Sequence, residues 1–272
     1  MSDLPQPGSH DPSPHAPALW GAQTSLALKH FAIGTQRMPI ELIHALARVK
    51  GAAARVNARL SRLDGTLAQA IAEAADEVAA GRHDAQFPLS VFQSGSGTQS
   101  HMNVNEVIAR LAAERLGGRP VHPNDDVNRG QSSNDTVPSA LHLALVLAWR
   151  ERLLPALDAL QATLQALASR HAHVVKLGRT HLQDAVPLTV GQEIGAWDTQ
   201  VALARRTIDA ALPALLELPL GGTAVGTGLN THPAFAREAC AELAASTGLA
   251  FVPPAADATH QAAKSCPALR AR

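Results

Sequence analysis

Apolar residues recur at alternating steps of four and three along most of this chain, which is the pattern of helices that bury one face. The first stripe comprises Leu42, Leu46, Val49, Ala53, Val56 and Leu60. Further stripes predict helices over residues 66–80, 103–116, 134–173, 190–215 and 233–246. The pattern therefore predicts an all-α protein built on long helices.

Glycine, threonine and proline mark the expected ends and bends of these helices. Gly117 follows the helix predicted over residues 103–116, and Gly248 follows the last helix, as C-terminal caps commonly do. Thr231 is the expected N-cap of that last helix. Pro155 lies inside the longest helix and is expected to kink it, because its ring removes a backbone N–H.

The charges of the chain balance, since Lys plus Arg and Asp plus Glu each total 23 among 272 residues. A balanced chain creates no net field to attract nucleic acid or an anionic membrane surface. Aromatic residues make up 3% of the chain and tyrosine is absent, which disfavours a base-stacking platform. We therefore expect no nucleic acid and no membrane among the partners of this protein.

Location and redox state follow from what the sequence contains. The first twenty residues carry neither Lys nor Arg, and no stretch is long and apolar enough to cross a bilayer. Cys240 and Cys266 are too few for a disulfide framework or a cysteine metal cluster. We expect a soluble, cytoplasmic protein.

Five polar segments rich in Ser, Thr, Asn, His and Gly separate the predicted helices. They cover residues 94–106, 121–126, 128–136, 176–188 and 220–233. The first and third lie at helix N-termini, where free N–H groups and the helix dipole favour an anion. An ordinary turn with an N-cap is the alternative for the first segment taken by itself.

The fourth polar segment contains the pair Thr180-His181, followed by Gln183 and Asp184. A histidine oriented by such neighbours can move protons near neutral pH. A hydrogen-bonded loop histidine without a catalytic role is the alternative. No spacing of His, Cys or carboxylate residues typical of a metal site is present, so no metal is expected.

Together these segments resemble the signature strings of class II fumarases, in the fumarase/aspartase superfamily. The matching strings cover residues 19–24, 96–106, 122–125, 131–135, 178–184 and 221–233, in the family's order. Aspartases are expected to differ at Thr180-His181 and at residues 220–223, where this chain follows the fumarase pattern. The resemblance extends from about Leu19 to about Val252 and favours the fumarases.

The resemblance implies an architecture, a reaction and an assembly. Residues 1–18, rich in Pro and polar residues, are expected to form a flexible arm. Residues 19–130 would form an N-terminal lyase domain, and residues 131–272 an incomplete central helix-bundle domain. The implied activity is the reversible addition of water to fumarate, giving L-malate, in a homotetramer whose active sites draw on three subunits.

The matching strings also imply roles for individual residues. His181 is the expected proton donor or acceptor. The residues expected to bind the substrate are Ser96, Gly97, Thr98, Ser132, Ser133, Asn134 and Thr180. A second, peripheral dicarboxylate site is expected at Arg119, His122, Pro123, Asn124 and Asp125. Hydroxyl and amide donors at helix N-termini suit the doubly charged carboxylate intermediate of this reaction, which requires no metal or organic cofactor.

The chain departs from the family pattern at several positions. His101 stands where an Asn is expected, Gly130 stands where a Ser is expected, and the linker over residues 118–120 is shortened. A Gly/Ser-rich loop ending in a Lys-Val-Asn-Pro-like string, which supplies a serine base in the family, is absent from these 272 residues. We therefore expect a truncated chain with negligible activity by itself. The alternatives are a non-catalytic helical remnant and an aspartase-like lyase.

Overall fold

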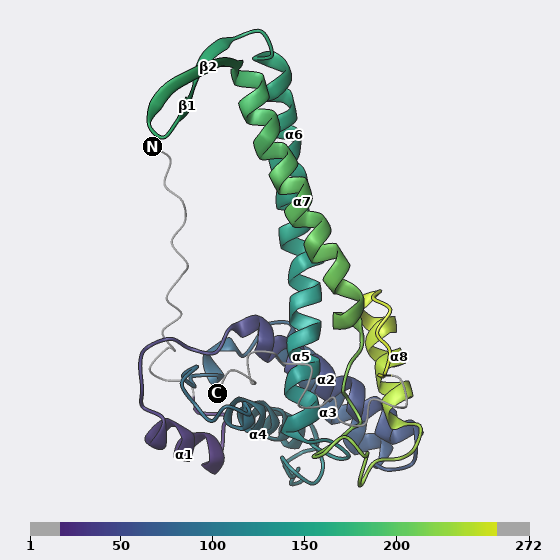
Figure 1. Cartoon of the computed structure of the whole chain (residues 1–272). Helices are drawn as coiled ribbons and strands as arrows, with labels where there is room; N and C mark the ends of the chain where they lie inside the picture. The colour runs from purple at the N-terminus through teal and green to yellow at the C-terminus, as the bar shows by residue number, and fades with distance from the viewer. Residues whose placement is uncertain (1–16, 255–272) are drawn as a thin grey trace. The chain divides into compact units, whose positions relative to one another are not determined.

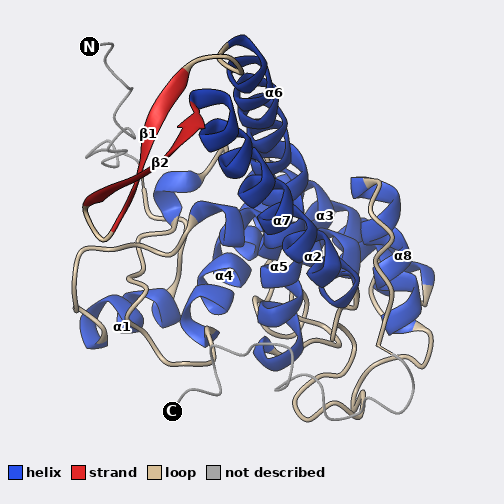
Figure 2. Cartoon of the chain, turned by 45° about the horizontal axis from the view of Figure 1, so that its top comes forward, coloured by secondary structure: helices blue, strands red, loops and turns tan. Residues whose placement is uncertain are grey.

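Helices make up most of the described chain, as the spacing of apolar residues predicted. The computed structural model describes residues 17–254. The predicted flexible arm therefore lies outside the described residues, apart from Pro17 and Ala18. The all-α class is confirmed, and the two strands drawn in Figure 2 are the exception within the described part of the chain.

The chain divides into two units. The first comprises the residues up to Ala144 together with those from Glu217 onward, and the second comprises Leu145–Leu216. These bounds differ from the division at residue 130 that the sequence suggested. The reason is that the chain after residue 216 belongs with the first unit, where the Gly221 N–H donates to the Asp135 carboxylate at 3.0 Å.

The first unit is organised around α2 (Ile40–Arg59). This helix packs against α3 (Gly65–Ala79), α4 (Thr98–Arg115) and α8 (Phe235–Thr247). The short η1 (Asp84–Gln86) precedes α4 in the chain, and α5 (Ser133–Ala148) follows it. Leu46, Val49, Ala53 and Val56 of the predicted stripe are fully buried. The apolar face of α2 therefore lies in the core of this unit.

The N-terminus of the first helix, α1 (Ala22–His30), is capped by a carboxylate from another helix. Glu106 of α4 accepts hydrogen bonds from the backbone N–H groups of Gly21, Gln23 and Thr24 at 2.8–3.1 Å, and from the Thr24 hydroxyl at 2.6 Å. The first N–H groups of a helix have no partner within it, and their positive dipole end favours an acid. Glu106 therefore holds residues 21–24 against α4.

Helix ends follow the sequence expectation at one end of α8 and not at the other. Gly248 adopts the left-handed conformation after α8, with φ 68°, as predicted. The predicted N-cap at Thr231 is wrong, because its hydroxyl donates to the Gly228 carbonyl instead. The His232 ring nitrogen Nδ1 accepts the Ala234 N–H at 3.1 Å, and α8 begins at Phe235.

The second unit contains two long antiparallel helices that lie side by side, α6 (Leu154–Arg170) and α7 (Val190–Leu216) (Figure 1). The Gln161 amide donates to the Asp198 carboxylate at 3.2 Å, and Arg205 pairs with Asp158. Polar pairs thus join the two helices along their length.

A β-hairpin replaces the loop that the sequence suggested over residues 176–188. β1 (Val175–Thr180) pairs in antiparallel fashion with β2 (Gln183–Thr189), and Thr180 lies opposite Gln183. His181 and Leu182 form the two-residue turn, both with positive φ, as this type of hairpin requires. Lys176 of β1 donates to Glu193 of α7 at 2.7 Å and joins the hairpin to the helix that follows it.

The single helix predicted over residues 134–173 is three segments. After α5, a wider π-helical turn, η2 (Trp149–Leu153), precedes α6. Pro155 cannot donate a backbone hydrogen bond, and its ring crowds the carbonyl of Glu151, four residues earlier. The disturbance expected from Pro155 thus takes the form of a π-helical turn.

Among the described residues, none of the helices combines the length and apolar character needed to cross a bilayer.

Candidate functional site

Two of the polar segments meet at the facing N-termini of α4 and α5. The Ser96 hydroxyl lies 2.8 Å from the Thr98 hydroxyl, which in turn lies 3.0 Å from the Ser133 hydroxyl. Residues 98 and 133 are 35 positions apart in the chain. The start of each helix also carries N–H groups that have no partner within the helix. This arrangement gathers hydroxyl and backbone donors at the positive ends of two helix dipoles.

Gly97 allows the two helix starts to approach one another. It occupies the N-cap of α4 with φ 67°, a left-handed conformation that side chains disfavour. A Cβ atom at this position would lie 2.9 Å from a methyl group of Val137 on α5. Glycine is therefore required here on both grounds, which gives a structural reason for its place in the motif.

Asp135 joins the glycine-rich segment to the start of α5. Its buried carboxylate accepts the N–H groups of Ser132, Gly221 and Thr223 at 2.9–3.0 Å, and the Thr136 hydroxyl at 3.2 Å. Burial raises the pKa of Asp135, and these hydrogen bonds act in the opposite direction. From sequence, Asp135 was only part of the matching string over residues 131–135. In the structure its carboxylate also binds the backbone of Gly221 and Thr223, 86 and 88 positions away in the chain.

The adjacent Asn134 faces the same glycine-rich segment. Its side-chain amide donates to the Ala224 carbonyl at 2.8 Å. The third and fifth polar segments of the sequence are therefore in direct contact. Asn134 has already used one of its two amide hydrogens in this contact, and its side-chain oxygen is a further acceptor.

A pocket of about 610 Å³ lies at the start of α5. It is lined by Asn124, Asp125, Asn128, Arg129, Gly130, Gln131, Ser132, Thr223, Ala224, Leu229 and Asn230. The volume is within the range of small-molecule sites. Three residues predicted from the sequence line this pocket. Ser132 belongs to the expected substrate-binding set, and Asn124 and Asp125 belong to the expected peripheral site. Ser96, Thr98, Ser133 and Asn134 are outside its lining.

The residues of the expected peripheral site do not all lie together. The His122 ring accepts the N–H groups of Asn124 and Asp125 at 3.3 and 2.9 Å, so residues 122–125 form one exposed turn that includes Pro123. Arg119 instead places its guanidinium 3.9 Å from the Asp64 carboxylate, at the start of α3. The structure thus groups four members of this set and gives the fifth another partner.

Thr180 and His181 belong to the second unit, whereas the other expected substrate-binding residues belong to the first. His181 is an exposed residue in the turn of the β1–β2 hairpin. Its left-handed backbone, with φ 48°, and that of the neighbouring Leu182, with φ 64°, are uncommon for residues other than glycine. Leu182 is 93% exposed. Strain of this kind is often found at functional sites.

A buried polar cluster lies behind the pocket and was not found from the sequence. Lys50 of α2 is fully buried, and its Nζ lies 2.6 Å from the Nε2 atom of His101 and 2.8 Å from the Asn128 side-chain oxygen. Burial holds the pKa of Lys50 well below its usual range, which Asp135 counteracts. Burial and the Lys50 charge also lower the pKa of His101. The available signal was a lysine four residues after Leu46, on the apolar face of the helix.

Among the described residues, no group of three or more His, Cys, Asp or Glu side chains is arranged to hold a metal ion. The donors gathered at α4 and α5 are hydroxyl, amide and backbone N–H groups. Such donors bind carboxylates and stabilise negative charge that develops on them. The chemistry that this arrangement can support is the binding and activation of a carboxylate substrate.

Comparison with known proteins identifies a family. A family model described as "Lyase" matches residues 12–268, which is most of the chain. The chain belongs to this lyase family. It is 59% identical over 241 residues to the fumarate hydratase class II of Chromobacterium violaceum, and 57% identical over 242 residues to that of Nitrosomonas europaea. The similarity to class II fumarases that the motifs indicated is therefore confirmed.

Solved structures of the lyase family have the same fold. The class II fumarase of Schistosoma mansoni matches with a TM-score of 0.84 at 40% identity, over 88% of this chain and 54% of that one. The fumarate lyase:delta crystallin of Brucella melitensis, bound to cobalt, also matches with a TM-score of 0.84, at 39% identity, over 91% of this chain and 54% of that one.

The chain spans about half the length of the curated lyases that it matches. The alignments to the Chromobacterium and Nitrosomonas relatives each cover 87% of this chain and 52% of the relative. A site that is complete in those proteins can therefore include residues from the part of their length that this chain does not match.

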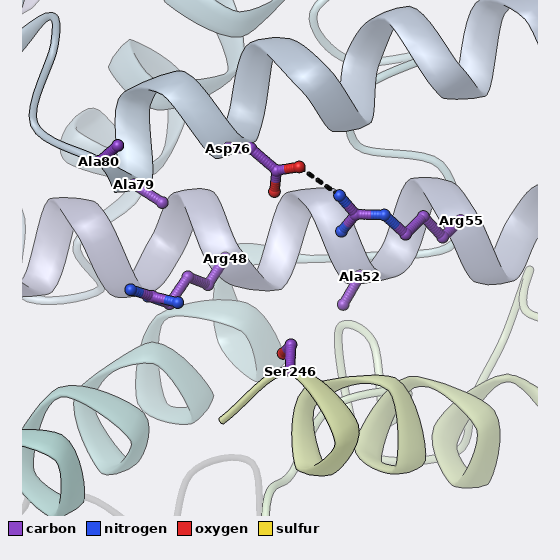
Figure 3. A pocket seen from close by; sticks show the side chains of 7 residues that line it. All are labelled: Arg48, Ala52, Arg55, Asp76, Ala79, Ala80 and Ser246. Carbon is purple, nitrogen blue, oxygen red and sulfur yellow. Dashed lines mark hydrogen bonds and ion pairs between the residues drawn. The ribbon is translucent and has the colours of Figure 1, made fainter. Parts of the chain in front are cut away.

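A smaller pocket of about 250 Å³ in this lyase lies among α2, α3 and α8 (Figure 3). Its lining includes Arg48, Arg55, Asp76 and Ser246. Figure 3 shows the Arg55 guanidinium turned toward the Asp76 carboxylate, with which it forms an ion pair. None of the residues implied by the fumarase motifs lines this pocket, so it is separate from the candidate site.

Proposed function

We propose that this chain contributes to a fumarate hydratase, which adds water reversibly to fumarate and forms L-malate. The observation that carries the proposal is the contact between Thr98 and Ser133, which brings two fumarase motifs together at facing helix N-termini. Fumarate presents two carboxylates, and such donor clusters bind carboxylates well. The names of the relatives support the same activity.

Electrostatic stabilisation is the role that the donors of the first unit suit best. In the dehydration direction a weakly acidic C–H proton leaves L-malate, and two negative charges accumulate on one carboxylate. Hydroxyl and amide groups from Ser96, Thr98, Ser133 and Asn134, held by the surrounding hydrogen bonds, would meet this charge without rearranging. The substrate-binding set also includes Gly97, Ser132 and Thr180 in this proposal.

His181 is the proposed proton donor or acceptor. Imidazole is the side chain that catalysis uses most often to transfer protons, and His181 is exposed. Its place in a strained hairpin turn suits a residue that reaches into a site formed with other subunits. The peripheral dicarboxylate site proposed at residues 122–125 is supported by their shared turn, and Arg119 would join it only by leaving Asp64.

A homotetramer is the proposed assembly, and the second unit supports it. No residue of α6 is buried, and only Gly191 and Ile194 are buried on α7. Leu160 and Trp197 are among the large apolar side chains that remain exposed on these helices. Apolar helix faces of this size require cover from further helices, which copies of the same chain can supply. The proposed location is the cytoplasm, where the free thiol of Cys240 is stable.

The experiment that tests the activity combines this chain with the missing part of a relative. Residues 1–272 would be mixed with the second half of the Chromobacterium fumarate hydratase, and fumarate consumption would be followed by its ultraviolet absorbance. We expect hydration from the mixture and negligible hydration from either part alone, because the chain lacks the Lys-Val-Asn-Pro-like loop.

Variants assign the activity to the proposed site. Ser133→Ala and His181→Asn should each lower the rate of the mixture by about a hundredfold, the effect typical of one charge-stabilising or proton-transferring group. Thr66→Ala, which removes an exposed hydroxyl on α3, is the matched control and should leave the rate unchanged. Faster addition of ammonia than of water would instead identify an aspartase-like lyase.

A further inference from the structure

The core of the first unit contains a lysine whose position packing does not explain. Lys50 is fully buried among the apolar residues of α2. Among the described residues, no carboxylate lies within ion-pair distance of its Nζ, which is hydrogen-bonded to His101 and Asn128. A methionine would fill a similar space without the cost of removing a charge from water. Packing alone therefore gives no reason for a lysine.

His101 is the acceptor that orients Lys50. Burial and the neighbouring Lys50 lower the pKa of His101, so its ring is neutral near pH 7. In the tautomer that carries its hydrogen on Nδ1, Nε2 of this ring accepts a hydrogen from the Lys50 Nζ. The Asn128 side-chain oxygen accepts a second hydrogen from the Lys50 Nζ at 2.8 Å. A donor fixed on one side by α4 thus points toward the loop that lines the pocket.

Asn128 connects Lys50 to the residues that line the pocket. With its oxygen occupied by Lys50, its amide nitrogen faces the other way and donates to the Asn124 side-chain oxygen and to the Gln131 carbonyl, each at 3.3 Å. All three of these residues line the pocket of about 610 Å³. An amide held at its oxygen cannot rotate without losing every one of these bonds.

A second polar side chain of α2 holds the same loop. Asn57 donates to the Arg129 carbonyl at 3.0 Å. Lys50 and Asn57 are seven residues, or two helical turns, apart, so they lie on the same face of α2. Two polar groups on one otherwise apolar helix face both reach the segment 124–131.

We propose that Lys50, supported by His101, is a positioning residue that fixes Asn128 and thereby shapes the wall of the pocket at residues 124–132. The role is distinct from catalysis, because Lys50 is separated from the pocket by Asn128 itself. The proposal concerns the shape of the pocket, and it rests on the proposed function only for the identity of the ligand.

Hydrogen exchange of the full chain tests this role directly. In Lys50→Met, backbone amides of residues 124–132 should exchange about tenfold faster, the factor expected when a hydrogen bond to a charged group that holds a loop is lost. Amides of α3, between Leu67 and Val78, should change by less than about twofold, because the methionine still fills the core. Lys29→Met, on the exposed side of α1, is the matched control.

Two further variants distinguish positioning from a general role in the core. Asn128→Ala leaves Lys50 in place and should accelerate exchange of residues 124–132 as much as Lys50→Met does, and combining the two should add nothing. His101→Leu should act like Lys50→Met, whereas His101→Asn, which retains an acceptor, should preserve more of the protection. Unchanged exchange in residues 124–132, or equal acceleration in α3, would overturn the proposal. Asn128→Ala decides the matter even if Lys50→Met fails to fold.

Titration with fumarate separates this proposal from the proposed function. If the unaltered chain binds fumarate in calorimetry, Lys50→Met should weaken binding about tenfold or more, while Lys29→Met should not. If the unaltered chain and its mixture with the second half of a relative both fail to bind fumarate, the proposed function is wrong. The exchange result still decides whether Lys50 positions the loop.

Discussion

The two units of this chain bury their helices to very different degrees. In the first unit, α2 has twelve buried residues among twenty, Ile43, Leu46 and Val49 among them. In the second unit, α6 has none among seventeen. Both helices nevertheless carry a similar stripe of apolar residues in their sequences. The difference teaches that an apolar stripe predicts a helix but does not say whether its cover comes from the same chain.

The largest effect should follow from charging the uncovered helices. Leu160→Glu combined with Trp197→Glu should abolish self-association. Each substitution would place a carboxylate in the interface between subunits, and burying that charge without a partner is costly. Sedimentation velocity measures the assembly. Leu26→Glu, at a site on the first unit that is 48% exposed, compared with 44% for Leu160, is the control and should leave assembly intact. A stable monomer of the unaltered chain would contradict the comparison.

Truncating one leucine in each unit should change stability very differently. Leu46→Ala, in the buried face of α2, should lower the free energy of unfolding by about 2 to 5 kcal/mol through lost contacts and a cavity. Leu160→Ala should lower it by less than about 0.5 kcal/mol when the chain is dilute enough to be dissociated. Urea unfolding followed by circular dichroism gives both values. Similar losses would show that α6 is covered within one chain.

An intermediate effect is expected from the polar anchor of the first unit. Asp135→Asn keeps the shape of the side chain but replaces one carboxylate oxygen with an NH2 group. This group would face either the N–H groups of Gly221 and Thr223 or the N–H group of Ser132, depending on which oxygen it replaces. Leaving such groups unsatisfied should cost about 2 to 4 kcal/mol of unfolding free energy. Asp198→Asn, in the second unit, is the comparison and should cost much less, because its contacts are exposed or half-buried. Equal costs would remove this distinction between the units.

The smallest effect concerns the pH dependence of the first unit. Because the pKa of His101 is lowered in the folded chain, the unfolded state binds an extra proton once the pH falls below about 6.5, and stability then decreases. Between about pH 7 and pH 5.5 this contribution is on the order of 1 kcal/mol. His101→Asn should lose correspondingly less stability over that range in urea unfolding. His30→Asn, on the exposed side of α1, is the control. Identical pH profiles for His101→Asn and the unaltered chain would contradict the assignment.

Much of the fold was predictable from the sequence, and the exceptions have local causes. The helices around Leu46 and before Gly248 were predicted with nearly the observed bounds. The hairpin was missed because its turn is His181-Leu182 and lacks the Asn-Gly or Asp-Gly pair that usually marks such turns. The cap at Thr231 was misassigned because the adjacent His232 makes the contact instead.

The candidate site was predictable as a list of residues but not as an arrangement. The motifs named Thr98 and Ser133, and the structure adds that their hydroxyls are 3.0 Å apart. Arg119 was expected beside residues 122–125, whereas its guanidinium lies at Asp64. Lys50 was missed because a lysine within an apolar stripe carries no mark of its role until its partners are known.

The sequence by itself determined where the helices lie and which lyase family the chain resembles, because helical periodicity and short motifs are properties of neighbouring residues. Only the tertiary structure decided that Lys50 meets His101, 51 positions away, and Asn128, 78 positions away. Contacts over such separations depend on how α2, α4 and the loop after α4 pack together. A buried charge also requires partners that no local pattern can specify.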